Sequence, residues 1–292
     1  SIGLDLLENM YANTNHVFAD TALNTSGKDL RSKTFSLDVE LFDSYLENLA
    51  TSSNSIGMEA SNGQAGVLST TDGAKSYLVD ENGIEWLQVF EKGIMGATFY
   101  YQATSVYFSD DKIGEAVNNS DPVDPENGKY YTTMEHHWDE AFGYFGVDID
   151  FPVNIPGSFW GKYCNKQDAT LNSNSDMMTQ FLTGRAALSA NVLTDRDAAI
   201  AAIRTEWEEI SAYQAITYVD DCIGYFGSDQ AKFLHALSEA YAFAWNLRYA
   251  PIETRRMTTA EHDTLMALFP TNFWNTTVTD LNNIKAAIQA KY

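Results

Sequence analysis

The chain has 292 residues and a formal net charge of -22 at pH 7, with 40 acidic residues against 18 Lys and Arg. This balance argues against sequence-independent binding to DNA or RNA, which requires basic side chains at the phosphates, and it favours cations as partners. An acidic surface is also consistent with a role in solubility alone. The length allows one large domain or two of moderate size with a substantial core.

The chain begins with elements that carry little chemistry. We expect a short helix at residues 4–11 and then a polar loop. The next helix is amphipathic, because Val39, Phe42, Leu46 and Leu49 recur at steps of three and four residues.

A long loop is predicted for residues 51–83, with one strand pair near 66–68 and 77–79. Loops of this length are often functional. A strong helix follows at 83–107, and Glu91 lies on its apolar stripe. A carboxylate in that position needs a partner or a place at a rim.

Residues 109–133 are acidic, and Pro122 and Pro125 mark turns within them. They match a calcium loop in composition only, since the order of ligands in an EF-hand is absent. A helix is predicted at 134–146, and the loop that follows it, up to about residue 174, is the expected boundary between two halves.

Five further helices are predicted after this boundary from their caps and apolar stripes. The longest ends at Gly224 or Gly227. The helices start at Ser175-Asp176, at Thr194-Asp195, at Ser228-Asp229, at the capping box Thr258-x-x-Glu261, and at residue 278.

The predicted class is all-α, because strand-like alternation is nearly absent. We expect two antiparallel helix bundles with long loops, formed by residues 1–150 and 151–292. No apolar run reaches the length of a transmembrane helix, and no leader opens the chain. The start at Ser1 and the many Asn, Ser, Thr and Tyr residues suit a bacterial export product whose signal was removed, although a cytoplasmic location stays open.

A pattern in the middle of the chain repeats about a hundred residues later. His136 and Glu140 belong to the pattern His-x-x-x-Glu-Ala-aromatic-small-aromatic, and His235 and Glu239 occupy the same positions in the second copy. Such self-similarity is typical of a duplicated structural unit. We therefore expect two related helical halves, each with a His/Glu pair on an inner helix.

These side chains are candidate metal ligands. Residues three or four apart share a helix face, so His136, His137 and Glu140 are predicted to converge on one point. Two such helices would offer two imidazoles and two carboxylates, and Glu91 would add an oxygen. Mixed N and O donors suit iron, zinc or manganese better than magnesium. The alternative is structural, since buried His and Glu also hydrogen-bond to each other and to tyrosines.

The sequence lacks the motifs of several well-known kinds of metal, nucleotide and catalytic site. HExxH is absent, HxxEH would need His where Ala141 stands, and the Glu-x-x-His order of di-iron bundles is reversed. No Walker loop, GxGxxG or GxSxG is present. Cys164 and Cys222 show no zinc spacing and no nucleophile signature, and a disulfide between them is left open.

Residues 134–146 (MEHHWDEAFGYFG) and 159–165 (FWGKYCN) resemble the bacterial domain-of-unknown-function family 4856. The shorter motif His137-x-x-Glu140 resembles that of the imelysin family, although the imelysin Gly two residues before the His is Glu135 here. That resemblance implies two four-helix bundles related by duplication. It also implies export to the periplasm or outer surface as a lipoprotein, a link to iron uptake, and a metal or ligand site that includes His137 and Glu140.

Three hypotheses follow. The first is an exported, non-enzymatic bundle protein that binds iron, zinc or a metal-dependent small ligand between its halves; its ligands are His136, His137, Glu140, His235, Glu239 and Glu91. Its only expected membrane contact is a removed lipid anchor. The second is a surface module that binds glycan or peptide through loops 51–83 and 109–133, with a structural His/Glu cluster. The third, a metallopeptidase, lacks an HExxH arrangement.

Overall fold

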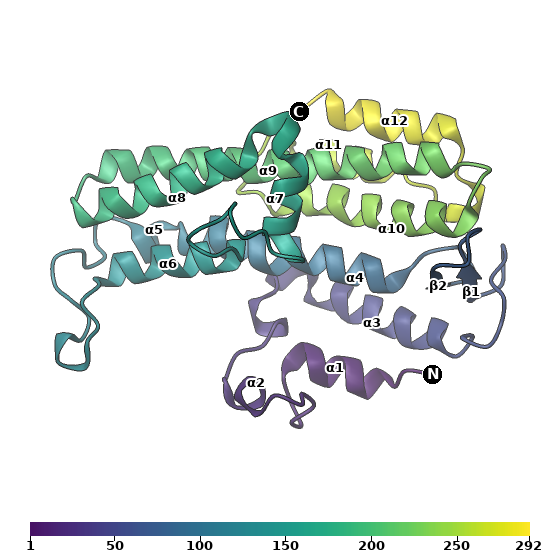
Figure 1. Ribbon diagram of the computed structural model, residues 1–292, viewed down its shortest axis with the longest axis horizontal. Helices are drawn as coiled ribbons and strands as arrows, with labels where there is room; N and C mark the ends of the chain where they lie inside the picture. Colours follow the sequence, from purple (N-terminus) through teal and green to yellow (C-terminus); the bar gives the residue numbers. More distant parts are fainter. The chain divides into compact units, whose positions relative to one another are not determined.

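A computed structural model describes residues 1–292 and shows a mostly helical protein, which confirms the all-α class (Figure 1). The chain forms two compact units. Unit 1 comprises residues 1–98, 215–248 and 257–292, and unit 2 comprises 99–214 and 249–256. This division differs from the boundary expected near residue 150. Unit 1 combines both ends of the chain, because the chain re-enters it within one continuous helix, α9 (Leu193–Tyr225).

Unit 1 is built around three adjacent helices, α3 (Val39–Ser53), α4 (Trp86–Ile94) and α10 (Gln230–Asn246) (Figure 1). Their contact faces are apolar, and Phe42 and Leu234 are fully buried. The other helices of this unit are α1 (Leu4–Ala12), α2 (Thr21–Thr25), α11 (Thr259–Met266), α12 (Val278–Gln289) and the C-terminal part of α9.

The predicted strand pair is present in unit 1 as an antiparallel hairpin of β1 (Gly66–Ser69) and β2 (Ser76–Val79). The turn is tied to the start of α10. Asp229 accepts hydrogen bonds from the backbone and hydroxyl of Thr71, at 3.1 and 2.9 Å. The segment expected to be a long loop is therefore anchored to a helix.

The helix predicted at 83–107 changes its winding. α4 ends at Ile94, and the chain continues as π-helical turns at Met95–Tyr100 and Gln102–Tyr107. At this point Asn246 Nδ2 donates a hydrogen bond to the Lys92 carbonyl oxygen at 2.9 Å. Gly96 makes room for it, since a Cβ there would lie 2.1 Å from Asn246 Oδ1. A side chain inserted into the hydrogen-bond ladder is a recognised cause of such irregular turns.

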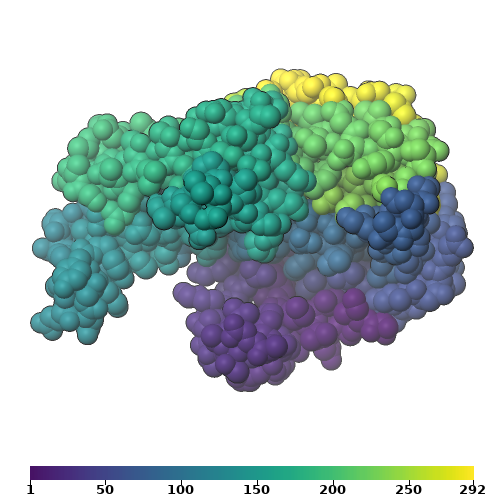
Figure 2. Space-filling view, viewed as in Figure 1, coloured from purple at the N-terminus to yellow at the C-terminus, as the bar shows by residue number.

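Unit 2 packs its helices around an aromatic core. Trp138, Phe145 and Trp207 are fully buried, and Trp138 Nε1 donates a hydrogen bond to the Phe181 carbonyl oxygen at 3.0 Å. The segment between α5 and α6 projects from this unit (Figure 2). The helices of the unit are α5 (Asp110–Ile113), α6 (Thr133–Phe145), α7 (Phe159–Leu171), α8 (Ser173–Ser189) and the N-terminal part of α9.

Local signals fix both ends of α6. A capping box joins Thr132 and Glu135, and Gly146 ends the helix in the left-handed conformation that glycine adopts without strain. Arg185 of α8 forms ion pairs with Glu135 and Asp139, at 2.6 and 2.9 Å. These ion pairs fix the orientation of α6 about its own axis. The histidines lie on its other face.

Gly184 of α8 faces Trp138, and we expect Gly184→Ala to lower the free energy of unfolding by about 2 kcal/mol. A Cβ at this position would lie 2.0 Å from Trp138 Cη2, and the ring is only 1% exposed. Gly143→Ala is the matched control, because nothing lies within 4 Å of its Cβ position. The control should be neutral or stabilising. Urea unfolding measures both, and equal stability of the two variants would contradict this packing.

Glu206 of α9 predicts a dependence of stability on pH. Burial raises its pKa from 4.5 to about 7, helped by Glu209 and Asp176. Its Oε1 has no hydrogen-bond partner. Because the folded-state pKa lies above the unfolded one, the protonated form favours folding, and the stability falls as pH rises from about 4.5 to 7.

Glu206→Gln should therefore raise the free energy of unfolding at pH 8 by about 1 kcal/mol, a figure reduced for the partial exposure of the carboxyl group. The same variant should change little at pH 4. Urea unfolding at the two pH values measures the difference. A gain of equal size at both would show that ionisation is not its cause.

His262 of α11 is buried, at 2% exposure, and its Nε2 donates a hydrogen bond to the Ala244 carbonyl oxygen at 3.2 Å. Burial lowers its pKa. Cys164 and Cys222 are both buried and unbonded, and burial raises the pKa of the Cys164 thiol to about 12. None of the helices combines the length and apolar character that a membrane crossing requires.

Candidate functional site

The first cluster of candidate residues lies in unit 1, around His235 of α10. The imidazole is held between two carboxylates, with Nδ1 2.7 Å from Glu85 Oε2 and Nε2 3.3 Å from Glu239 Oε2. Glu85 immediately precedes α4, and Glu239 lies one turn after His235. The ring of Tyr77, from β2, stacks on the imidazole with the centroids 4.1 Å apart.

An ammonium group completes this cluster. Lys92 Nζ is 2.7 Å from Glu91 Oε1 and 3.7 Å from Glu239 Oε1, and its side chain is only 8% exposed. Glu239 Oε1 also accepts a hydrogen bond from the Tyr218 hydroxyl at 2.9 Å. Lys92 therefore supplies a positive charge to the carboxylates of unit 1, and this charge reduces the free-energy cost of burying them.

The second cluster lies in unit 2, on α6. His136 Nε2 and Glu140 Oε2 are 3.5 Å apart, as expected for residues four apart on a helix. The ring of Tyr131 stacks on His136 at 5.4 Å. The Tyr107 hydroxyl donates a hydrogen bond to Glu140 Oε1 at 3.2 Å. Burial, with the charge of Glu140 next to it, raises the pKa of Tyr107, so the phenol is a stable donor.

His137 is oriented by the backbone of α5. Its Nδ1 is hydrogen-bonded to the carbonyl oxygen of Lys112. Since a carbonyl only accepts, Nδ1 carries the proton, and Nε2 is available for another partner. A metal-binding histidine is commonly held in this way by a carbonyl behind the ring.

The two clusters share a geometry that the sequence repeat did not reveal in full. Each has a His and a Glu four residues apart, a tyrosine ring stacked on the imidazole, and a tyrosine hydroxyl on the carboxylate. They differ in charge. Glu239 has the ammonium of Lys92, whereas the only ion pair of Glu140 is with His136.

The predicted ligands are thus distributed over two units. His136, His137 and Glu140 lie in unit 2, and His235, Glu239 and Glu91 lie in unit 1. No group of three or more His, Cys, Asp or Glu side chains is arranged to hold a metal ion. Glu91, expected to add an oxygen ligand, is about half exposed and pairs with Lys92.

Sequence reasoning missed Lys92 and Glu85, the two charged partners of the unit 1 cluster. A signal for Lys92 was present, because it follows the buried Val89 by three residues and so lies on the apolar side of α4. Glu85 gave no such signal, because its contact with His235 joins residues 150 positions apart.

The fold and these clusters define an all-α protein that presents His/Glu pairs on two of its helices. The chain belongs to the family described as domain of unknown function 4856 (DUF4856), whose model matches residues 3–292. This confirms the family expected from residues 134–146 and 159–165. No curated protein and no solved structure matches the chain.

Proposed function

We propose that this protein binds a divalent transition metal, iron or zinc, in unit 2 through His136 and Glu140, with His137 beside them. The observation that supports it is the difference in charge between two otherwise similar clusters. In unit 1 an ammonium group pairs with the carboxylate of the His/Glu pair. In unit 2 no lysine or arginine does so. Glu140, which has no lysine or arginine beside it, is thus available to an external cation, in a chain whose charge of -22 attracts cations.

The donor set suits a transition metal. His136 Nε2 and Glu140 Oε2 are 3.5 Å apart. This separation suits two atoms that coordinate the same ion, each at about 2.0–2.2 Å from it. Tyr107 and the Lys112 carbonyl oxygen do not bind the ion in this proposal. They orient Glu140 and His137 through hydrogen bonds. With so few protein ligands, water or a small ligand would complete the coordination, so we infer a metal-dependent binding protein.

Duplication of an ancestral helical unit explains why the two clusters are similar. We infer it from the repeated His/Glu spacing and from the tyrosines that stack on each imidazole. On this account one copy acquired Lys92 and became structural, while the other kept an open site. A relation to imelysins, export, a lipid anchor and a link to iron uptake stay predictions.

Elemental analysis tests the proposal. The purified protein is loaded with Zn²⁺ or Fe²⁺, dialysed and analysed for metal, next to His137→Ala/Glu140→Ala. Wild type should keep roughly one ion per chain and the variant none, because the variant lacks a carboxylate that the ion requires. A wild type as empty as the variant would end the proposal.

Lys92→Met should create a second metal site. It removes the ammonium from Glu239 and leaves His235 Nε2 3.3 Å from Glu239 Oε2, while Glu85 still orients the ring from Nδ1. We expect roughly two zinc ions per chain by calorimetric titration, and roughly one for the control Lys92→Arg, which keeps the cation. One ion in both variants would show that the lysine does not distinguish the two clusters.

The alternatives have less support in the structure. A glycan or peptide site in loops 51–83 and 109–133, with a structural His/Glu cluster, stays a prediction. The first of these loops is tied to α10 through Asp229, and Lys232 adds an ion pair with Asp72 at 2.9 Å. A metallopeptidase still lacks its motif.

A further inference from the structure

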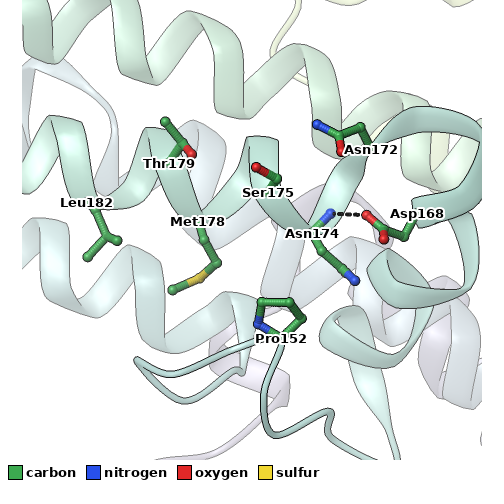
Figure 3. A pocket seen from close by; sticks show the side chains of 8 residues that line it. All are labelled: Pro152, Asp168, Asn172, Asn174, Ser175, Met178, Thr179 and Leu182. Atoms are coloured by element: carbon green, nitrogen blue, oxygen red, sulfur yellow. Dashed lines mark hydrogen bonds between the residues drawn. The ribbon is translucent and has the colours of Figure 1, made fainter.

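A pocket of unit 2, separate from the His/Glu clusters, lies where α7 ends and α8 begins. Its volume is about 330 Å³. Asp168 of α7 and Asn174, Met178 and Leu182 of α8 line it, together with Pro152 from the preceding loop (Figure 3). This is near the lower limit of volumes found for small-molecule sites, so the pocket fits a ligand of about one ring.

Asn174, a residue of the pocket wall, has a buried polar atom without a hydrogen-bond partner. Asn174 is 5% exposed, and its Oδ1 has no hydrogen-bond partner. The rest of the residue is fixed, because its backbone N–H donates to Asp168 Oδ1 and its Nδ2 donates to Asn165 Oδ1, both at 2.9 Å. A buried acceptor left unpaired is costly. The two hydrogen bonds hold Asn174 and Asp168 in place in the pocket wall.

The other polar groups of the wall add acceptors. Asp168 uses one carboxylate oxygen for the Asn174 backbone, and its other oxygen accepts no hydrogen bond from the protein. The exposed Ser175 adds a hydroxyl, which can donate or accept. A free carboxylate oxygen and a hydroxyl favour a ligand with several O–H donors. A carboxylate in the wall and a chain charge of -22 disfavour an anion.

The opposite side of the pocket is apolar. Figure 3 shows Asn174 and Met178 extending from the side of α8 on which Pro152 lies, with Leu182 one turn further along the helix. An apolar surface across from hydrogen-bond acceptors suits a molecule with C–H groups on one face and hydroxyls at its edge. A bare or hydrated cation would gain nothing from these apolar groups.

We propose that this pocket binds one ring of a neutral sugar, whose hydroxyls form hydrogen bonds with the free oxygen of Asp168 and with the Ser175 hydroxyl while its C–H face contacts Pro152 and Met178. The site is independent of the proposed metal site. It also differs from the glycan site expected in loops 51–83 and 109–133, since it is built from α7, α8 and the loop before them.

Saturation-transfer NMR on the full chain tests this with a panel of neutral hexoses, pentoses and N-acetylhexosamines. At least one sugar should give a saturable signal. Ser175→Trp should abolish it, because the indole would occupy the pocket from an exposed position. Thr183→Trp is the matched control on an exposed position of α8 outside the pocket, and it should bind as wild type does.

A conservative variant adds a second measurement. Asp168→Asn keeps the acceptor for the Asn174 backbone and replaces the free oxygen by an N–H donor, so sugar affinity should fall about tenfold. Thermal unfolding verifies that each variant is folded. The proposal is overturned if no neutral sugar in the panel gives a signal, or if the signal of Ser175→Trp equals that of Thr183→Trp.

Discussion

Glu140→Gln should weaken zinc binding in unit 2 by about 100-fold or more, since it removes the one anionic ligand from the proposed site. The carboxylate lies 3.5 Å from His136 and is oriented by Tyr107. Glutamine has the same shape, so the fold and the tyrosine contact should persist. Isothermal titration calorimetry with Zn²⁺ measures the affinity, and the variant should be as stable as wild type without metal.

The matched control is Asp139→Asn on the same helix. Asp139 is about half exposed and pairs with Arg185, so the control removes an equal charge one residue away without touching the proposed ligands. It should bind zinc within a few fold of wild type, because surface charges act weakly and are screened by salt. Equal losses in the two variants would mean that general acidity, and not a site, attracts the metal.

His235→Ala should lower the free energy of unfolding by about 3 kcal/mol, because it leaves two buried carboxylates without their shared partner. The side chains of Glu85 and Glu239 are 5% and 8% exposed. Guanidinium unfolding measures the loss. Zinc affinity should remain unchanged, since we assign a structural role to this cluster.

A double-mutant cycle with Glu239→Gln tests the cause of that loss. Once the neighbouring carboxylate is neutral, removing the imidazole should cost clearly less than it does in wild type. Costs that add without any coupling would show that His235 contributes through packing on Tyr77 and not through charge.

Local signals in the sequence predicted much of the fold. The Thr258/Glu261 capping box and the cap at Asp229 are both present where expected. Such caps depend on residues within one turn of helix, so the sequence contains all the information they need. α8 begins at Ser173, two residues before the expected Ser175, with the left-handed Asn172 as its N-cap residue.

Features that depend on tertiary contacts were not predictable in this way. The π-helical turns after α4 involve Asn246, which bonds the Lys92 carbonyl oxygen across 154 positions of the chain. Each of the two units is formed by segments that are far apart in the sequence. A single boundary position along the chain cannot describe such a division.

The candidate site could likewise be predicted only in its local contacts. The spacing of four residues predicted both His/Glu contacts, and both are present, at 3.5 and 3.3 Å. It did not predict that Lys92 pairs with only one of the two carboxylates, because that contact joins α4 to α10. The proposed function depends on this difference, so it required the structure.

The most direct test of metal binding is anomalous X-ray scattering at the zinc and iron edges, from crystals grown without chelator and soaked with each metal. We expect a peak within bonding distance of His136 Nε2 and Glu140 Oε2, and none between His235 and Glu239. Soaked crystals with no peak at α6, or with a peak only beside His235, would contradict it.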